Sequence, residues 1–402
     1  MARILVVGGS LGGLLAANIL VRNGHRVQVI EKAASSLDGR GAGIVTHEAL
    51  FAGLRRAGVT VDASVGVEVT SRVALGPDGE VVARLPVTQT LSSWSRLYQL
   101  LREALPEDCL VQGTNARSVT ETADGVTLHC DGERHFEGDL LLASDGLRSV
   151  VRAQFAPEIV PEYAGYVGWR GVCDESVLSQ STMCTVFDCF GFGLPPGEQL
   201  IGYPVAGAGN ATTRGRRRFN FVWYRPAASA AELAALLTDA DGVHHPLGIP
   251  PNKVAWRQVA AMRTAARELL APQFAEIIEK TAQPFLQPIF DVNSTRIAFG
   301  RVLLMGDAAF VARPHVGMGV TKAAEDAMAL SDCIDRLGAN AAAGLAYEAL
   351  RLPAGRAVVQ RARKLGGYMQ SQGSSNVILR DTEEVLRETA VDLGLRESVA
   401  LA

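Results

Sequence analysis

The sequence predicts an α/β fold in which a parallel-sheet domain is interrupted by an antiparallel sheet and followed by helices. Three observations predict it. A short apolar strand near the start of the chain runs into a glycine-rich turn and an apolar helix. From about residue 163 to 290 the pattern changes to short alternating strands separated by Gly and Pro. An apolar strand then returns between Ala298 and Met305, and long helical patterns follow it.

Composition and charge exclude several classes of partner. With 402 residues the chain is too long for one simple core, so two domains are expected. The net charge of −3 offers no attraction to nucleic acid or to an anionic membrane. The six cysteines are scattered without a C-x-x-C pair, which favours a reducing, cytoplasmic location. The His244–His245 pair lacks further ligands in the sequence, so no metal site is expected.

The glycine-rich turn is the first motif with chemical content. It is a G-x-G-x-x-G fingerprint with Ser10 at the second position, whose hydroxyl can donate to a phosphate oxygen. Gly8 permits the tight turn, Gly13 lets the helix pack on the strand, and the helix N-terminus attracts a pyrophosphate. Glu31 follows the next strand, where an acid accepts hydrogen bonds from a ribose hydroxyl. The residues expected to bind this end of a dinucleotide are Gly8, Ser10, Leu11, Gly12, Gly13, Glu31 and Lys32.

A competing interpretation of residues 4–21 is a signal or membrane segment, because the stretch carries no charge. Its Gly-Gly-Ser-Leu-Gly-Gly centre makes a poor membrane helix, and residues 26–31 alternate as a strand does. The strand–turn–helix interpretation is therefore favoured, and no membrane partner is expected.

The remaining patterns predict the order of the elements. Helices are expected over residues 48–58, 92–101 with a serine cap, 229–238, 265–282 and 317–337, and again in the tail. The predicted domains are 1–70, 91–162 and 291–340 for the first, 71–90 and 163–290 for the second, and 341–402 for a C-terminal helical segment.

Two later motifs specify the dinucleotide. They are Asp145-Gly146 and Gly306-Asp307, the second followed by Pro314 and a glycine-rich turn at 317–319. Together with the fingerprint, and in this order, they resemble the single-component FAD-dependent aromatic monooxygenases of the para-hydroxybenzoate hydroxylase type. The resemblance covers roughly residues 1–340.

Three local features give a narrower resemblance. They are the Gly-Gly-Ser form of the fingerprint and the runs 163–171 and 310–315. These are more similar to the 2,6-dihydroxypyridine 3-hydroxylases than to the family in general. Phe310 stands where many relatives carry histidine, which makes that side of the expected site more apolar.

The resemblance implies a Rossmann-like FAD-binding domain, an inserted antiparallel-sheet substrate domain and C-terminal helices. It implies that Asp307 accepts hydrogen bonds from the ribityl hydroxyls of FAD, and that the helix N–H groups of Gly319 and Val320 face the flavin pyrimidine. It places Arg40 and Arg96 beside the diphosphate or the flavin. The other cofactor-binding residues that it implies are Gly41, Gly43, Asp145, Gly306, Pro314, Gly317 and Met318.

The implied reaction uses NADH or NADPH to reduce FAD, after which O2 forms a flavin 4a-hydroperoxide that hydroxylates an electron-rich ring. The expected ring is a hydroxypyridine such as 2,6-dihydroxypyridine. The site must hold this ring close, exclude water and help to ionise its hydroxyl. The catalytic candidates are His47, Tyr203, Pro314 and His315. The competing interpretations are a surface histidine at a helix start for His47 and core packing for Tyr203.

Several other functions share this framework. A flavin halogenase needs a W-x-W-x-I-P stretch, which neither Trp169 nor Trp223 provides. A phenol or hydroxynicotinate hydroxylase, an epoxidase, an isoprenoid reductase and a non-catalytic FAD-fold binding protein stay as alternatives. The intact Gly306-Asp307 motif counts against the binding protein and against a plain NAD dehydrogenase. A homodimer formed through the C-terminal helices is a further expectation.

Overall fold

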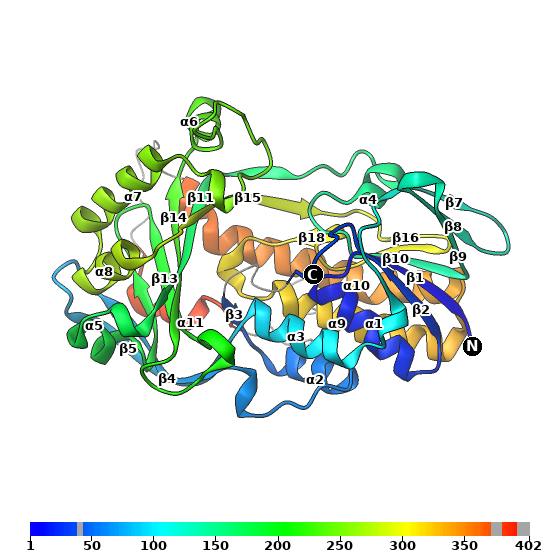
Figure 1. Cartoon of the computed structure of the whole chain (residues 1–402), viewed down its shortest axis with the longest axis horizontal. Helices are drawn as coiled ribbons and strands as arrows, with labels where there is room; N and C mark the ends of the chain where they lie inside the picture. The colour runs from blue at the N-terminus through cyan, green and yellow to red at the C-terminus, as the bar shows by residue number, and fades with distance from the viewer. Residues whose placement is uncertain (38–42, 371–379, 392–402) are drawn as a thin grey trace.

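The computed structural model describes residues 1–37, 43–370 and 380–391. These residues form an elongated molecule with one large sheet toward each end, and the chain passes between the two ends several times (Figure 1). Arg40 and Gly41, two of the predicted cofactor ligands, lie outside the described residues.

The first large sheet carries the fingerprint. Its strand order is β16-β17-β10-β1-β2-β6, and its neighbours are parallel except for the hairpin of β16 and β17. Parallel strands bring their carboxyl ends to one edge, which is where dinucleotides bind to such sheets. The bounds are β1 Arg3–Val7, β2 Arg26–Ile30, β6 Leu110–Val111, β10 Leu140–Ala143, β16 Ala298–Phe299 and β17 Val302–Leu304.

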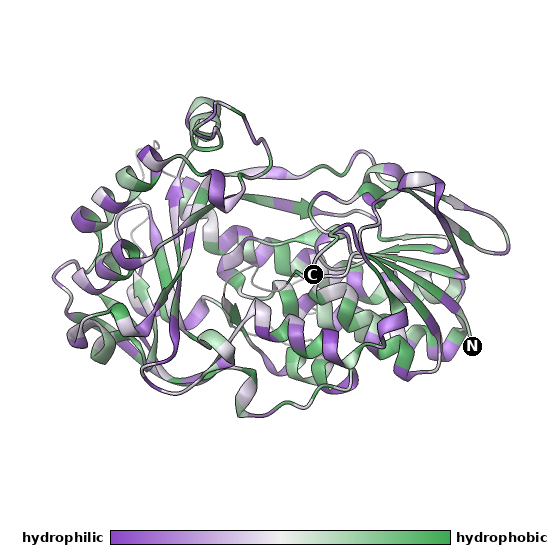
Figure 2. Ribbon diagram, in the orientation of Figure 1, coloured by the Kyte–Doolittle hydropathy of each residue, from purple (hydrophilic) through white to green (hydrophobic). Residues whose placement is uncertain are grey.

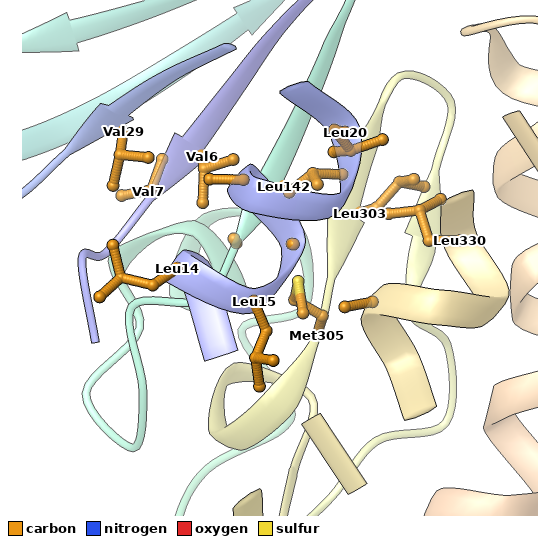
Figure 3. Packing of buried hydrophobic residues seen from close by; sticks show 14 of the residues in the cluster. Val6, Val7, Leu14, Leu15, Leu20, Val29, Leu142, Leu303, Met305 and Leu330 are labelled. Carbon is orange, nitrogen blue, oxygen red and sulfur yellow. The ribbon is translucent and has the colours of Figure 1, made fainter. Parts of the chain in front are cut away.

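The core of this end lies between the sheet and the helices α1 (Leu11–Arg22) and α9 (Gly319–Leu337). Figure 3 shows Leu14 and Leu15 of α1 packing among side chains from the strands and from α9. Burial of one such aliphatic side chain contributes about 1.5–3 kcal/mol. The packing therefore fixes α1 against β1, and with it the position of the turn between them.

The second large sheet is mostly antiparallel, in the order β18-β15-β11-β14-β13-β12-β4-β5-β3. Along β14, Phe219, Phe221 and Trp223 pack under the outer helices, while Val222 and Tyr224 face the first sheet. The sheet thus presents one face to a core and the other to a cavity. The bounds are β3 Gly43–Val45, β4 Val67–Leu75, β5 Val81–Ser93, β11 Glu162–Asp174, β12 Cys189–Gly193, β13 Gln199–Val205, β14 Arg218–Pro226, β15 Phe285–Asn293 and β18 Phe310–Val311.

Helices and a small sheet complete the structure. The long helix α10 (Ala341–Gly366) contacts both large sheets, through β16 at one end and β15 and β18 further along. Figure 2 shows hydrophobic residues along the strands of the first sheet and a mixture of both kinds on the outer helices. The other bounds are α2 Glu48–Arg56, α3 Trp94–Ala104, β7 Ala116–Glu121, β8 Val126–Cys130, β9 His135–Gly138, α4 Val150–Phe155, α5 Gln180–Val186, α6 Ala230–Leu236, α7 Trp256–Leu269, α8 Pro272–Lys280 and α11 Thr382–Glu388.

Several predicted elements differ from the observed ones. The helix expected over 265–282 is two helices, because Pro272 has no amide hydrogen and can only begin a helix there. The strand expected from Ala298 is a hairpin, since Gly300 turns the chain with φ of +59°. The cap of α3 is Ser93, whose hydroxyl accepts a hydrogen bond from the Arg96 N–H at 3.1 Å.

The strands of the second sheet come from more of the chain than expected. Both β3 and β18, which lie outside residues 71–90 and 163–290, also pair into it. The domain boundaries themselves stay a prediction.

The six cysteines are all free thiols, and five of them are buried. No group of side chains suited to a metal ion occurs among the described residues. In the same part of the chain, every helix is too short or too polar to cross a membrane.

Candidate functional site

A cavity of about 310 Å³ opens at the carboxyl edge of the first sheet, directly beyond the fingerprint. The turn after β1, the end of β2 and the loop after β10 border it. Five predicted cofactor residues line this cavity, namely Gly8, Ser10, Glu31, Lys32 and Asp145. The structure therefore brings together residues from three separate parts of the sequence.

Two glycines of the fingerprint are required by close backbone contacts. Gly8 has a φ of +104°, and a Cβ on it would lie 2.5 Å from the carbonyl oxygen of Ser144. A Cβ on Gly13 would lie 1.9 Å from the carbonyl oxygen of Gly8. By contrast, a Cβ on Gly146 would meet no atom within 4 Å, because that backbone faces the open cavity. The turn is thus a cradle of bare backbone.

Glu31 is buried at the end of β2 and positioned by two backbone donors. Its Oε2 accepts a hydrogen bond from the Gly9 N–H and its Oε1 from the Ala33 N–H, each at 2.8 Å. Each carboxylate oxygen has a second lone pair, so Glu31 can still accept hydrogen bonds from ribose hydroxyls.

Asp145 lines the cavity, and one of its two carboxylate oxygens has no hydrogen-bond partner in the described part of the protein. Its Oδ2 accepts a hydrogen bond from the Val150 N–H at 2.8 Å, while its Oδ1 is buried without a partner. Burial raises the pKa of this carboxyl. Buried acceptors almost always have a partner, so the free Oδ1 indicates that a ligand group belongs here.

A second cavity, of about 390 Å³, adjoins the first and shares Ser10, Trp94, Ser144 and Gly146 with it. It lies between the fingerprint, the segment 306–320 and the inner face of the second sheet. The predicted residues that line it are Ser10, Leu11, Gly12, Gly43, Tyr203, Gly306, Asp307, Pro314, Gly317, Met318, Gly319 and Val320. Together the two cavities form one long site along the carboxyl edge of the first sheet.

Asp307 faces the second cavity from a turn whose shape a charged network fixes. The Gly306 N–H donates to Asp326 Oδ2 at 3.0 Å, and Asp326 Oδ1 accepts a hydrogen bond from Arg351 at 2.7 Å. Lys322 is fully buried nearby, with its Nζ 3.9 Å from Asp326. Loss of hydration raises the pKa of Asp307, and the positive charge of Lys322 opposes this shift.

The start of α9 presents free backbone donors to the same cavity. Gly317 adopts a left-handed conformation with φ of +67° and turns the chain into the helix. A Cβ on Gly319 would meet no atom within 4 Å, so the helix terminus is open to a ligand. A helix N-terminus stabilises negative charge placed against its N–H groups.

These features fit FAD at every point where the structure can test it. The bare glycine cradle accommodates a diphosphate, Glu31 and the orphaned Asp145 oxygen accept from sugar hydroxyls, and Asp307 can accept from a ribityl chain. The open N-terminus of α9 suits the electron-accepting end of a flavin.

The wall opposite Asp307 is the inner face of the second sheet. Tyr203 of β13 and Asn220 of β14 stand directly opposite each other in the sheet register. The Asn220 Oδ1 accepts a hydrogen bond from the Gly43 N–H at 2.8 Å, and a Cβ on Gly43 would lie 2.4 Å from the Tyr203 ring. The absence of a side chain at Gly43 thus lets β3, at the end of the sheet, pack closely against Tyr203 and Asn220.

His315 lies behind this wall rather than in it. It is fully buried, and its Nε2 lies 3.0 Å from the Tyr166 hydroxyl. Its ring centroid is 4.2 Å from that of Tyr224, and its Nδ1 has no partner. Burial, together with the charges of the nearby arginines, lowers the pKa of His315 well below its ordinary value. His315 therefore contacts Tyr224, which lines the cavity, while Pro314 lines it directly.

Two predicted residues lie elsewhere. His47 lines a different cavity, with its Nδ1 2.9 Å from Thr321 Oγ1 and its Nε2 3.4 Å from the carbonyl oxygen of Ala390. Arg96 donates from Nε and Nη2 to Ser64 and is outside the linings of both joined cavities. Phe310 packs against Gly355 of α10 and not against the cavity, contrary to the expectation that it makes the site more apolar.

Sequence reasoning missed several residues of the cavity wall, among them the polar side chains of Arg170, Asn220 and Tyr224. The available signal was alternation along β11 and β14, which sets these polar side chains on the face opposite to Trp169 and Phe221. Alternation shows that these side chains share one face of the sheet. Only the folded structure shows that this face borders the second cavity.

The comparisons with known proteins agree with this geometry. Residues 1–190 and 253–362 match the family described as FAD binding domain, and residues 163–291 match one described as FAD binding domain-like. The chain is 31% identical to the 2,6-dihydroxypyridine 3-monooxygenase of Paenarthrobacter nicotinovorans, with 92% of each chain covered. It is 30% identical to the aurachin C monooxygenase/isomerase of Stigmatella aurantiaca, covering 97% of this chain and 94% of the relative.

A solved structure shares the whole fold. The 2,6-dihydroxypyridine-3-hydroxylase from Arthrobacter nicotinovorans superposes with a TM-score of 0.87 at 29% identity, with 96% of each chain covered. The resemblance drawn from the three motifs is therefore confirmed, and the chain belongs to the FAD-binding-domain family of aromatic monooxygenases.

Proposed function

We propose that this protein is an FAD-dependent monooxygenase that uses NADH or NADPH and O2 to hydroxylate an electron-rich, hydroxylated aromatic ring. The proposed ring is a hydroxypyridine such as 2,6-dihydroxypyridine. The observation that carries the proposal is the pair of joined cavities, which leads from a dinucleotide cradle to a wall of tyrosine and amide side chains. The names of the two relatives above support a monooxygenase, and one of them supports the hydroxypyridine.

When bound, FAD supplies electron transfer from the nicotinamide and activation of O2. The chain has three tasks around it. The glycine cradle, Glu31 and Asp145 would hold the dinucleotide end of FAD, and Asp307 would hold its ribityl chain. The helix terminus at Gly319 would stabilise negative charge on the flavin ring system. Apolar side chains of the sheet, with Pro314, limit the entry of water to the reacting ring.

Among the four catalytic candidates, the linings of the cavity favour Tyr203 and Pro314 as direct contacts of the ring. Burial raises the pKa of Tyr203, so its hydroxyl acts as a hydrogen-bond donor rather than as a base. We assign His315 a positioning role through Tyr166 and Tyr224. For His47 we propose a structural role, because it contacts Thr321 and the carbonyl oxygen of Ala390.

The test is oxidation of NADH and NADPH by FAD-loaded protein in air, with and without candidate rings. The panel is 2,6-dihydroxypyridine, 6-hydroxynicotinate and simple phenols, with analysis of both product and peroxide. We expect oxidation stimulated by a hydroxypyridine and a hydroxylated product. Stimulation that yields only peroxide, for every ring, would contradict the proposed hydroxylation while leaving the flavin site intact.

The other assignments are tested separately. A homodimer through the C-terminal helices predicts twice the chain mass in light scattering. A cytoplasmic location, supported by the six free thiols, predicts that the protein stays with the soluble fraction of gently lysed cells.

A further inference from the structure

Two arginines line the second cavity, and Arg170 is the one that the antiparallel sheet contributes, while Arg313 comes from the segment before Pro314. Arg170 lies on β11, two residues from Gly168 and four from Tyr166, so all three share the inner face of the sheet. The sheet register sets Arg170 opposite Val222 of β14, which also lines the cavity. The position is thus on the same wall as Tyr203, and it is fixed by backbone pairing on both sides.

The guanidinium of Arg170 forms no ion pair within the part of the chain that the structure describes. No carboxylate lies within ion-pair distance of Arg170, and its Nε is buried without any hydrogen-bond partner. The neighbouring arginines differ in this respect. Arg313 pairs with Asp291 at 3.0 Å, and Arg225, on the adjacent strand, pairs with Glu198 at 2.9 Å.

An uncompensated cation at a cavity wall is costly unless a ligand neutralises it. Arg170 is half-buried, so a ligand that fills the cavity removes its charge from water, and an anionic ligand compensates for that loss. The charge of Arg170 acts on two neighbouring side chains. Burial raises the pKa of Tyr203 and of Tyr224, and the positive charge of Arg170 opposes this rise. Arg170 therefore acts on the space where the ring must lie.

The rest of the wall supplies hydrogen-bond donors rather than a base. Burial raises the pKa of Tyr224 to about 12, so its hydroxyl stays protonated, and this hydroxyl has no partner. Asp307 is the only carboxylate, and no histidine is present, among the described residues that line this cavity. A lining of this kind is suited to a ligand that arrives already ionised.

We propose that Arg170 binds the ring substrate as an anion, through a planar edge that offers two adjacent acceptors to the guanidinium fork. The ring nitrogen and exocyclic oxygen of a deprotonated 2-hydroxypyridine form such an edge, and so does a ring carboxylate. Two parallel N–H donors match either edge and fix the ring in its plane. The substrate class follows from this: hydroxylated rings that are monoanions when they bind. The inference rests on the proposed function, which it makes more specific.

The experiment measures ligand binding, not turnover. FAD-loaded wild type, Arg170→Met and Arg170→Lys are titrated by calorimetry with three ring compounds, at a pH where the acidic ones are ionised. 2,6-Dihydroxypyridine carries the N–C–O edge, 3-hydroxybenzoate carries a carboxylate, and 2,6-dimethoxypyridine carries neither acidic edge. Arg218→Met is the matched control, because Arg218 lies on the same sheet in an exposed ion pair with Asp174. Flavin content and melting temperature verify that each variant is folded.

We expect Arg170→Met to weaken binding of an anionic ring roughly 10- to 100-fold, the usual value of hydrogen bonds to a charged group. Arg170→Lys should recover only part of this, since it keeps the charge and loses the fork. If Arg170→Met loses affinity for 2,6-dihydroxypyridine alone, Arg170 binds the N–C–O edge of the ring. If it loses affinity for 3-hydroxybenzoate alone, Arg170 binds a carboxylate. Binding of the neutral ring should not change.

Two results overturn the inference. One is wild-type affinity for both anions in Arg170→Met, and the other is an equal loss for the neutral ring. Failure of the proposed function has a different signature. In that case the anions still bind in an Arg170-dependent way, while no ring is hydroxylated by the wild type in air.

Discussion

The cofactor side of the site is lined mainly by backbone groups, whereas the substrate side is lined by side chains. On the cofactor side the contacts are mostly backbone: the turn at Gly8, the turn at Gly306 and the open start of α9 at Gly319. On the substrate side the wall is a sheet whose backbone groups pair with each other, so side chains such as Arg170 and Tyr203 must meet the ligand.

This difference decides what can be recognised in a sequence. A backbone cradle needs glycine at fixed spacings, because any Cβ would collide or fill the site. A wall of side chains requires only that successive residues of a strand point to opposite faces of the sheet, which is true of every strand. Variants on the two sides should therefore fail in different ways.

The largest expected effect is that of Gly13→Ala on the cofactor side. The new Cβ would lie 1.9 Å from the Gly8 carbonyl oxygen, so α1 must move away from β1. We expect loss of bound FAD and a fall in the free energy of unfolding of at least about 3 kcal/mol. Flavin absorbance of the purified protein and urea unfolding measure the two effects.

The control is Gly367→Ala, at a helical glycine where a Cβ would meet no atom within 4 Å. It should retain full flavin and wild-type stability. Full flavin in Gly13→Ala as well would mean that the turn is not a tight backbone cradle.

A smaller effect is expected from Asp307→Ala. It removes a cavity-facing acceptor without changing the backbone, so FAD should bind roughly 10- to 100-fold more weakly while the fold persists. Titration of the apoprotein with FAD, followed by quenching of flavin fluorescence, measures the dissociation constant. Asp332→Ala, which removes an exposed ion pair from the same helix α9, should leave it unchanged. Purification of Asp307→Ala with a full flavin complement would rule out the assigned role.

Most residues that the sequence predicts for the cofactor line the joined cavities, whereas the sequence singled out few side chains of the opposite wall. Gly8, Glu31, Asp145 and Asp307 all line the joined cavities as the motifs implied. Arg96 donates to Ser64 and does not line the joined cavities, so its place beside the cofactor stays a prediction. No local pattern distinguishes such an arginine from one that reaches a ligand.

The substrate wall required the fold itself. Arg170, Asn220 and Tyr224 come from two strands, and only the register of β11 with β14 brings them to one face of the second cavity. His47 illustrates the converse. It follows a glycine loop in the sequence, yet the start of α2 sets it toward Thr321 and the C-terminal segment.

An intermediate effect is expected where the two sides meet, at His315. In the unfolded chain its imidazole takes up a proton below its ordinary pKa of 6.5, whereas in the folded protein the lowered pKa keeps it neutral. The unfolded state then binds more protons, so the free energy of unfolding falls as the pH drops below that value. The slope from one such group is about 1.4 kcal/mol per pH unit, down to the folded-state pKa.

The pH test compares slopes rather than absolute stabilities. Urea unfolding of wild type and His315→Asn is followed from about pH 7.5 to about pH 5.5, and over this whole range the wild type should lose about 1.4 kcal/mol more stability than the variant. The lost ring packing lowers the stability of the variant equally at each pH, so it does not affect the slope. Identical slopes in the two proteins would show that His315 is protonated in the folded state.

The smallest effect compares one tyrosine from each side. The Tyr347 hydroxyl donates to the Leu304 carbonyl oxygen at 3.1 Å beneath the first sheet, whereas the Tyr224 hydroxyl is buried at the cavity wall without a partner. Without ligand, Tyr347→Phe should cost about 1 kcal/mol, and Tyr224→Phe should cost nothing or stabilise by up to about 1 kcal/mol. Thermal unfolding of the FAD-loaded variants measures both changes.

An anionic ring should then stabilise Tyr224→Phe less than wild type, because the Tyr224 hydroxyl contributes a hydrogen bond only when the ligand is bound. If the ring stabilised Tyr224→Phe as much as wild type, the Tyr224 hydroxyl would not contact the ligand. Tyr224 would then belong to the hydrophobic core, and fewer side chains of the wall would face the substrate.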